Sequence, residues 1–430
     1  MGVFAKLKVF FKYFIFILRY VKKTINLRLE QIVTAMQHVN PFYTTNNIPS
    51  RYFCDRAQET ETLVRSVTNG NNMVLMSPRR MGKTGLINHV FTDKRIGKEY
   101  NCCFIDIYDT SSLQEFTFRL GQEVFRRQSA GGIRKGARFL EVLKSIRGEF
   151  SYDPATLGPK FALSLGQIQQ PLRTLEEILQ FMESSSKPWL VAIDEFQQIG
   201  KYDEKNMEAL LRTRFQRLAN VTFIYSGSER HLLGQMFSSA ARPFYMSTGT
   251  LELKPIDRDK YVEFARRQFR NAGKSITKDA VEGLYDLMEG YTFFMQKTLN
   301  EVFASTEKGG DAGQIEVFAA MEYLLDTADT TYRNILAGLS KGQRTVLSTI
   351  AVDGHAENVL SQSYISRHYL GAASSVQAAV RSLLAKQLIS RDADTYFLDD
   401  KFLELWIRRC YGISLEESWV ERGREVFKAG

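Results

Sequence analysis

Gly82, Lys83 and Thr84 follow the apolar stretch NNMVLM, an arrangement typical of a loop that binds phosphate groups. The full pattern is Gly-x-x-x-x-Gly-Lys-Ser/Thr, and one of its four fixed positions differs because Ser77 replaces the first glycine. Backbone N–H groups of such a loop hold the β- and γ-phosphates, the lysine neutralises their charge, and the hydroxyl ligates Mg²⁺. The predicted nucleotide-binding residues are Ser77, Pro78, Arg79, Arg80, Met81, Gly82, Lys83, Thr84 and Gly85, with Thr84 also a metal ligand.

A pair of carboxylates ends another apolar run. In KPWLVAIDEFQQIG (187–200), Asp194 is predicted to hold the same Mg²⁺, and Glu195 to orient and deprotonate an attacking water. The alternative is that these two carboxylates only mark the solvent-exposed end of a strand. The run VTFIYSGSER (221–230) carries Ser226 and Ser228, which would sense the γ-phosphate or position that water.

Alternating strands and helices must position these residues. The run before the loop predicts a buried strand, and the residues after it have helical spacing. Four more strands are predicted within 101–110, 187–200, 221–230 and 248–256, with helices between them such as 172–184 and 206–219. This order predicts an α/β fold: a P-loop NTPase with a mainly parallel sheet.

Several short boxes resemble the archaeal-type ATPase family, which belongs to the AAA+/STAND group of P-loop ATPases. They are NPF (40–42), YFCDRAQE (52–59), SPRRMGKT (77–84), WLVAIDEFQQI (189–199) and IYSGS (224–228). The resemblance runs from about residue 40 to about 411. It implies an ATPase domain at 40–255, a helical lid at 256–335, and Arg56 near the adenine end of the nucleotide, whereas the lid sensor stays unassigned.

The region from Leu339 onward predicts a winged helix-turn-helix, assigned here to 336–415 and followed by a tail at 416–430. Three helical patterns precede a hairpin around 392–395, and the third helix is expected to begin at an N-cap, Ser374 or Ser375. That helix would present Ser374, Ser375, Gln377 and Arg381 to a DNA major groove. Residues 341–411 hold nine basic and seven acidic residues, so packing or protein contact is the alternative use.

The first 39 residues form a basic, aromatic extension. Seven basic residues precede the first acidic one, Glu30; without them the net charge of +9 falls to 50 basic against 48 acidic residues. Residues 1–28 suit a helix lying on an anionic membrane surface, and the alternative is a native start at Met36. The four cysteines contain no Cys-x-x-Cys pair, which favours reduced packing residues in a cytoplasmic protein.

These patterns predict an Mg²⁺-dependent ATPase whose nucleotide state moves a winged helix toward or away from double-stranded DNA. The cofactors are ATP and Mg²⁺, Glu195 and Lys83 are catalytic, and a homo-oligomer is expected, with Arg212, Arg214, Arg230 and Arg242 as candidate arginine fingers. The alternative is a slow ATP-binding switch that acts on a protein partner or at the membrane surface. A third hypothesis is a protein that binds nucleotide but does not hydrolyse it. Only Ser77, in place of the first glycine of the loop, suggests this.

Overall fold

The structure is a computed structural model, and it describes residues 40–45, 48–130, 136, 139, 142–143, 151–153, 158–160 and 168–429 of the chain. The helix predicted at residues 1–28 lies outside these described residues. Within the described ranges, no helix is long and apolar enough to cross a bilayer.

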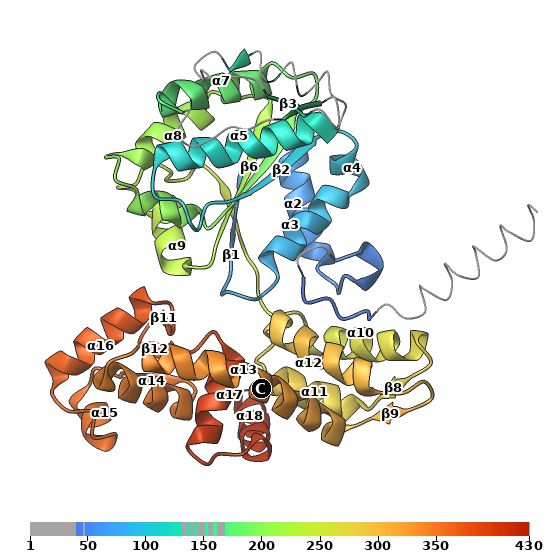
Figure 1. The fold of residues 1–430 in the computed structure, drawn as a ribbon, viewed down its shortest axis with the longest axis vertical. Helices are drawn as coiled ribbons and strands as arrows, with labels where there is room; N and C mark the ends of the chain where they lie inside the picture. Colours follow the sequence, from blue (N-terminus) through green and yellow to red (C-terminus); the bar gives the residue numbers. More distant parts are fainter. Residues whose placement is uncertain are drawn as a thin grey trace, which may run out of the picture.

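A five-stranded sheet with the order β2-β5-β6-β1-β7 forms the centre of the first domain (Figure 1). Every pairing in it is parallel, which confirms the predicted fold class. Its strands are mostly apolar and buried, because helices cover both faces of such a sheet. The strands are β1 (Met73–Met76), β2 (Asn101–Asp106), β5 (Trp189–Asp194), β6 (Val221–Gly227) and β7 (Gly249–Glu252).

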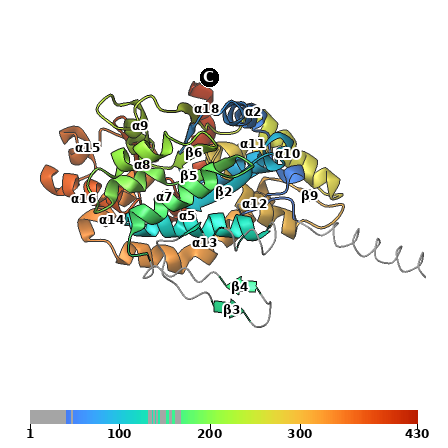
Figure 2. The same ribbon diagram turned by 90° about the horizontal axis from the view of Figure 1, so that it is seen from above.

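Side chains along each strand alternate between two separate cores. In β5, Leu190 and Ala192 join the core under one layer of helices, and Val191 and Ile193 join the other. The first layer is α2 (Ala57–Thr68), α3 (Lys83–Thr92) and α4 (Lys94–Gly97). The second is α5 (Leu113–Ala130), α7 (Pro171–Glu183), η3 (Phe196–Lys201), α8 (Met207–Phe215) and α9 (Arg230–Ser238). The strands β3 (Ser151–Asp153) and β4 (Gly158–Lys160) pair as a separate hairpin (Figure 2).

A helical lid follows the sheet, and the start of the described chain packs into it. Phe42 is fully buried among Phe264, Phe269 and Phe303 of the lid, and a 3-10 turn, η1 (Ser50–Tyr52), leads back to the sheet domain. The lid comprises α10 (Arg258–Asn271), α11 (Lys278–Leu287), α12 (Thr292–Ser305), α13 (Gln314–Ala337) and the short parallel pair β8 (Ser275–Ile276) and β9 (Asp311–Ala312).

Three helices and a three-stranded antiparallel sheet, in the order β10-β12-β11, form a winged helix. They are α14 (Lys341–Asp353), β10 (Ala356–Glu357), α15 (Gln362–Arg367), α16 (Ala373–Ala385), β11 (Ser390–Asp392) and β12 (Thr395–Phe397). The predicted N-cap of α16 is wrong. The cap is Ala372, which makes no side-chain capping bond, so both Ser374 and Ser375 lie in the first turn.

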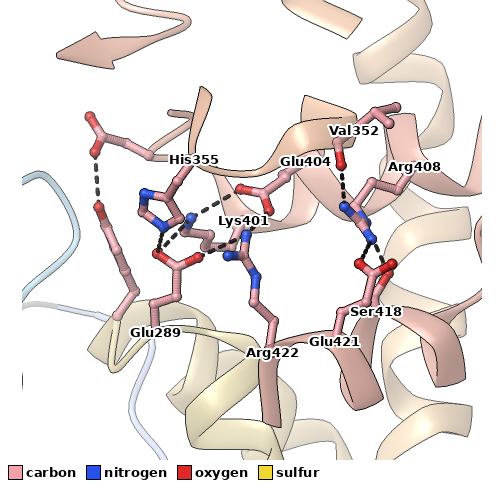
Figure 3. A network of polar contacts seen from close by, with 11 residues as sticks. Glu289, Val352, His355, Lys401, Glu404, Arg408, Ser418, Glu421 and Arg422 are labelled. Atoms are coloured by element: carbon pink, nitrogen blue, oxygen red, sulfur yellow. Dashed lines mark hydrogen bonds and ion pairs between the residues drawn. The ribbon is translucent and has the colours of Figure 1, made fainter. Parts of the chain in front are cut away.

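Two further helices, α17 (Lys401–Cys410) and α18 (Leu415–Ala429), join the winged helix to the lid. One continuous apolar core runs from the lid through the winged helix, and Trp419 of α18 packs against it. At the same junction, Glu289 of the lid pairs with His355, Lys401 and Arg422, and Glu404 pairs with the last two (Figure 3). The shared core and this ion network make the lid, winged helix and α18 one body.

Candidate nucleotide site

The register of the parallel strands brings the predicted catalytic residues to one edge of the sheet. Leu75 of β1 lies beside Ser226 of β6, and Ile193 of β5 lies beside Tyr225. All three strands therefore end at the same level, where the phosphate loop begins. The Ser226 hydroxyl donates to Oδ1 of Asp194 at 2.6 Å, which fixes that carboxylate at the edge.

The phosphate loop joins β1 to the first turn of α3. Arg80 and Gly82 adopt left-handed φ values of 66° and 92°, which let the loop turn back over its own backbone. The side chain of Lys83 is 7% exposed, and its Nζ donates to the carbonyls of Ser77 at 3.1 Å and Pro78 at 3.2 Å. Burial lowers the pKa of Lys83, while Asp194 and Glu195 oppose that shift. An anion in the loop would stabilise the charged amine further.

The residues beside Lys83 provide oxygen ligands suited to a hard cation. The hydroxyl of Thr84 donates to Oδ2 of Asp194 at 3.2 Å, and Asp194 is 7% exposed. In the part of the chain that the structure describes, no group of three or more His, Cys, Asp or Glu side chains could hold a metal. The pair fits Mg²⁺, which usually takes one or two side-chain oxygens and completes its shell with phosphate and water.

Glu195 occupies a constrained position directly after β5. Its φ is 55°, and its Oε2 accepts hydrogen bonds from Gln197 Nε2 at 2.6 Å, Ser228 Oγ at 2.9 Å and Ser228 N at 3.2 Å. Arg79 of the phosphate loop in turn donates to Ser228 Oγ at 3.3 Å. The orientation of the carboxylate is thus set by three donors, two from the residue that follows β6 and one from η3.

A further carboxylate, Asp106, ends β2 directly beside Asp194. Burial raises its pKa, the N–H of Tyr108 opposes this, and the negative charges of Asp194 and Glu195 add to the increase. The sheet edge therefore concentrates negative charge beside the phosphate loop, and the buried Lys83 lies close enough for Asp194 and Glu195 to oppose the lowering of its pKa by burial.

A cavity of about 320 Å³ lies in front of these groups. Its sheet-domain wall is built by Arg79, Arg80, Gly82, Lys83, Thr84, Gly85, Asp194 and Glu195. The opposite wall comes from the lid residues Thr292, Phe293 and Gln296 and from an N-terminal strap, the segment that carries Tyr43, Thr44, Thr45 and Ile48. The phosphate loop, the acidic strand end and the lid therefore meet around one space.

The remaining predicted site residues do not line this cavity. Ser77 is fully buried, Pro78 faces a second cavity, and the side chain of Met81 belongs to the lid core. Ser226 and Ser228 contact the two carboxylates, as described above. Arg56 is 4% exposed; its Nη1 donates to the carbonyl of Lys254 at 2.6 Å and pairs with Glu59, so it fixes the link between sheet domain and lid.

Three of the candidate arginine fingers make ion pairs within the chain. Arg214 pairs with Glu176, Arg242 pairs with Glu208, and Arg230 pairs with both Glu252 and Asp392. The fourth, Arg212, has a buried Nε without a hydrogen-bond partner.

Sequence reasoning missed the strap and lid residues of the cavity. The polar residues of α12 include three that are spaced four apart, Thr292, Gln296 and Asn300, on a helix that is otherwise mostly apolar. That spacing predicts one polar face and could have indicated the lid contact from the sequence. The Thr292 hydroxyl donates to the carbonyl of Met81 at 3.4 Å, and the N–H of Phe293 donates to that of Arg80 at 3.1 Å. The lid helix is thereby attached directly to the phosphate loop.

The wing and the residues that flank it contact the sheet domain beside this site. Arg230 pairs with Asp392 of β11 at 3.0 Å, Tyr108 donates to Gln387 at 3.0 Å, and Arg80 pairs with Asp400 at 3.1 Å. A second cavity of about 800 Å³ lies between the wing and the end of β6, and Arg79 lines both this cavity and the first one. We call the three contacts the wing latch.

The sheet has the strand order of the P-loop NTPase fold, in which a strand, β6, separates the loop strand from the acidic strand. Solved structures with this fold include the Walker-type ATPase PabY2304 of Pyrococcus abyssi, with a TM-score of 0.56 and 19% identity over 86% of this chain and 99% of that one. Another is the ORC2 protein of Aeropyrum pernix in ADPNP–ADP complexes, with a TM-score of 0.53 and 13% identity over 87% of this chain and 98% of that one.

The carboxy-terminal part has its own match. A family model described as a probable winged helix domain matches residues 330–409. A search of curated proteins found no match. The resemblance to archaeal-type ATPases is confirmed at the level of the fold: a P-loop ATPase core, a helical lid and a winged helix.

Proposed function

We propose that this chain is a Mg²⁺-dependent ATP-binding and ATP-hydrolysing switch that couples its nucleotide state to the position of a winged helix. One observation carries the proposal: Lys83, Thr84, Asp194 and Glu195, from separate segments, line a single cavity that the lid completes. A phosphate cradle, a cation site and a carboxylate within one space are the parts that phosphoryl transfer to water needs.

Each residue has a separate role in that reaction. Lys83 exchanges its two loop carbonyls for phosphate oxygens and neutralises them. Thr84 and Asp194 would hold Mg²⁺, which when bound would offset charge on the phosphates. Glu195, oriented by Gln197 and Ser228, accepts a proton from the attacking water.

The switch follows from how the two bodies meet. The lid and winged helix share one core, so they rotate together, and the wing latch ties them to the sheet domain mainly through polar groups. Arg79 and Arg80 lie in the cavity wall and also hold Ser228 and Asp400. Phosphates that attract these two guanidinium groups would compete with both contacts, and loss of the Arg80–Asp400 pair would loosen the latch.

Double-stranded DNA is the partner we propose, on the basis of the third helix of the winged helix. Ser374, Ser375, Gln377 and Arg381 are all exposed on α16 while the wing is docked, so the face suited to a major groove is accessible. Asp392 and Asp394 of the wing are paired with arginines, which limits their repulsion of phosphates. A protein partner is the second candidate, favoured by the small basic excess of residues 341–411.

Steady-state ATPase activity of the full chain, with and without duplex DNA, tests the proposal. We expect DNA to raise turnover in the wild type. Lys83→Ala should lose ATP binding, and Glu195→Gln should bind ATP but turn it over at least about 100-fold more slowly. Lys94→Ala, a lysine of α4 outside the cavity, is the matched control. Turnover that DNA does not change would favour a protein partner, and ATP binding without hydrolysis would contradict the role of Glu195.

A further inference from the structure

One polar side chain of the lid faces the cavity without a partner. Gln296 of α12 is 6% exposed, lines the cavity wall, and has a buried amide oxygen that accepts no hydrogen bond. An unpaired buried polar atom destabilises a protein by about 1–3 kcal/mol. Its position in the cavity indicates that a ligand supplies the missing donor.

The neighbours of Gln296 on the same helix face show which part of a ligand it would meet. Four residues earlier, Thr292 is bound to Met81 of the phosphate loop. Four residues later, the Asn300 amide donates to the carbonyl of Phe42 at 2.7 Å, and Asn40 donates to the carbonyl of Asn300 at 2.8 Å. Gln296 therefore lies one helical turn, about 6 Å along the axis, from Thr292, which contacts the phosphate loop, and equally far from Asn300, which contacts the start of the described chain.

The strap and helix α3 close this part of the cavity with a wall that is partly apolar. A Cβ atom placed on Gly85 would lie 3.7 Å from Cδ1 of Ile48 and 3.9 Å from Phe53, so the strap packs on the first turn of α3. Tyr43 and Ile48 of the strap face the cavity. A flat, partly apolar group with polar edges fits between this wall and Gln296, whereas the phosphates belong at the loop.

We infer that Gln296 is the lid's hydrogen-bonding contact with the nucleoside of the bound nucleotide. The inference rests on the proposed function, since it takes the phosphate loop as the site of the triphosphate. The amide oxygen requires a donor, which either the exocyclic amine of adenine or a ribose hydroxyl supplies. Because the contact joins the nucleoside to the lid, it makes nucleotide affinity depend on lid position.

Binding measurements with Gln296→Leu, a variant of similar size that lacks the amide, test this inference. The ligands are Mg²⁺ complexes of ATP, GTP, 2′-deoxyATP and 3′-deoxyATP, and inorganic tripolyphosphate. We expect Gln296→Leu to weaken ATP binding about 10- to 100-fold and to leave tripolyphosphate binding unchanged. Lys83→Ala should weaken both. Gln268→Leu, a buried glutamine on α10 of the same lid, is the control for folding and should bind ATP like the wild type.

The remaining ligands separate the two donors. A base contact predicts that the variant loses the wild type's preference for ATP over GTP. A ribose contact predicts that either 2′-deoxyATP or 3′-deoxyATP binds the wild type weakly. Its affinity should then match that of ATP for Gln296→Leu.

Two results would overturn the inference. Unchanged ATP affinity in Gln296→Leu contradicts it and leaves the proposed function intact. Equal losses for ATP and tripolyphosphate would assign Gln296 a structural role. A wild type that binds neither ATP nor tripolyphosphate contradicts the proposed function itself.

Discussion

Ser228 holds Glu195 twice: its hydroxyl and its backbone N–H both donate to Oε2 of that carboxylate, at 2.9 and 3.2 Å. The two residues directly follow strands β6 and β5, which are neighbours in the sheet. A glutamate held in this way has its orientation fixed before a nucleotide arrives.

Replacing Ser228 by Ala should therefore lower kcat for ATP hydrolysis about 10-fold with little change in KM. The variant keeps the backbone donor but loses the hydroxyl, so the carboxylate is less well oriented toward water. A tenfold loss equals about 1.4 kcal/mol of transition-state stabilisation. If turnover rises instead, the hydroxyl restrains Glu195 in an inactive position.

Ser226 should control the response to Mg²⁺. Its hydroxyl fixes Asp194 at 2.6 Å without forming part of the cavity wall, so it acts through that carboxylate. Ser226→Ala is expected to raise the Mg²⁺ concentration for half-maximal ATPase activity about 10-fold and to leave kcat at saturating Mg²⁺ within about threefold. Thr222→Val, at a buried position earlier on β6, is the control. A loss of kcat that excess Mg²⁺ does not restore would argue against this role.

The wing latch should open when Arg230 is replaced. Arg230→Met removes the ion pair with Asp392, a partly exposed contact worth at most about 1 kcal/mol, so the ratio of docked to undocked molecules should fall by up to about fivefold. Trypsin cleavage after Arg391 measures the undocked fraction. This cleavage should be faster in the variant, and in the wild type with ATP, than in the wild type without nucleotide. Arg242→Met breaks an ion pair with Glu208 within the sheet domain and serves as the control. Equal cleavage rates in both variants would contradict the latch.

The ion network in Figure 3 should make the protein sensitive to acid. Burial opposes ionisation of Glu289, but Lys401 at 2.9 Å, His355 and Arg422 outweigh it, so the pKa of Glu289 lies below its usual range. A lowered carboxyl pKa contributes stability that is present above the unfolded-state value of about 4.3 and is lost as the pH falls through the folded-state value.

Glu289→Gln should accordingly lower the free energy of unfolding by about 3 kcal/mol at pH 7 and flatten its loss on acidification. Denaturant midpoints measured between pH 7 and pH 3 provide the comparison. Glu263→Gln removes an exposed ion pair of the same lid and should cost less than about 1 kcal/mol. A pH profile for Glu289→Gln that parallels the wild type would show that the network does not govern acid stability.

Much of the sheet domain was predictable because its signals are local. An apolar run precedes the phosphate loop with Lys83, and two others end in Asp194 and Ser226. Such runs are typical of strands buried on both faces, and parallel strands bring their ends to one edge. The start of α16 shows the limit of such signals. Ser374 and Ser375 are good capping residues, yet the helix begins one residue before them, at Ala373.

The amino-acid sequence by itself determined the order of strands and helices, the phosphate loop and the acidic strand end, because each depends on residues close together in the chain. Only the tertiary structure decided that Phe42 packs into the lid, that Gln296 faces the cavity, and that Asp392 reaches Arg230. These contacts join residues 160 or more positions apart, or depend on which face of a helix its neighbours cover. Periodicity predicts that such a helix has a buried face, and packing determines what that face contacts.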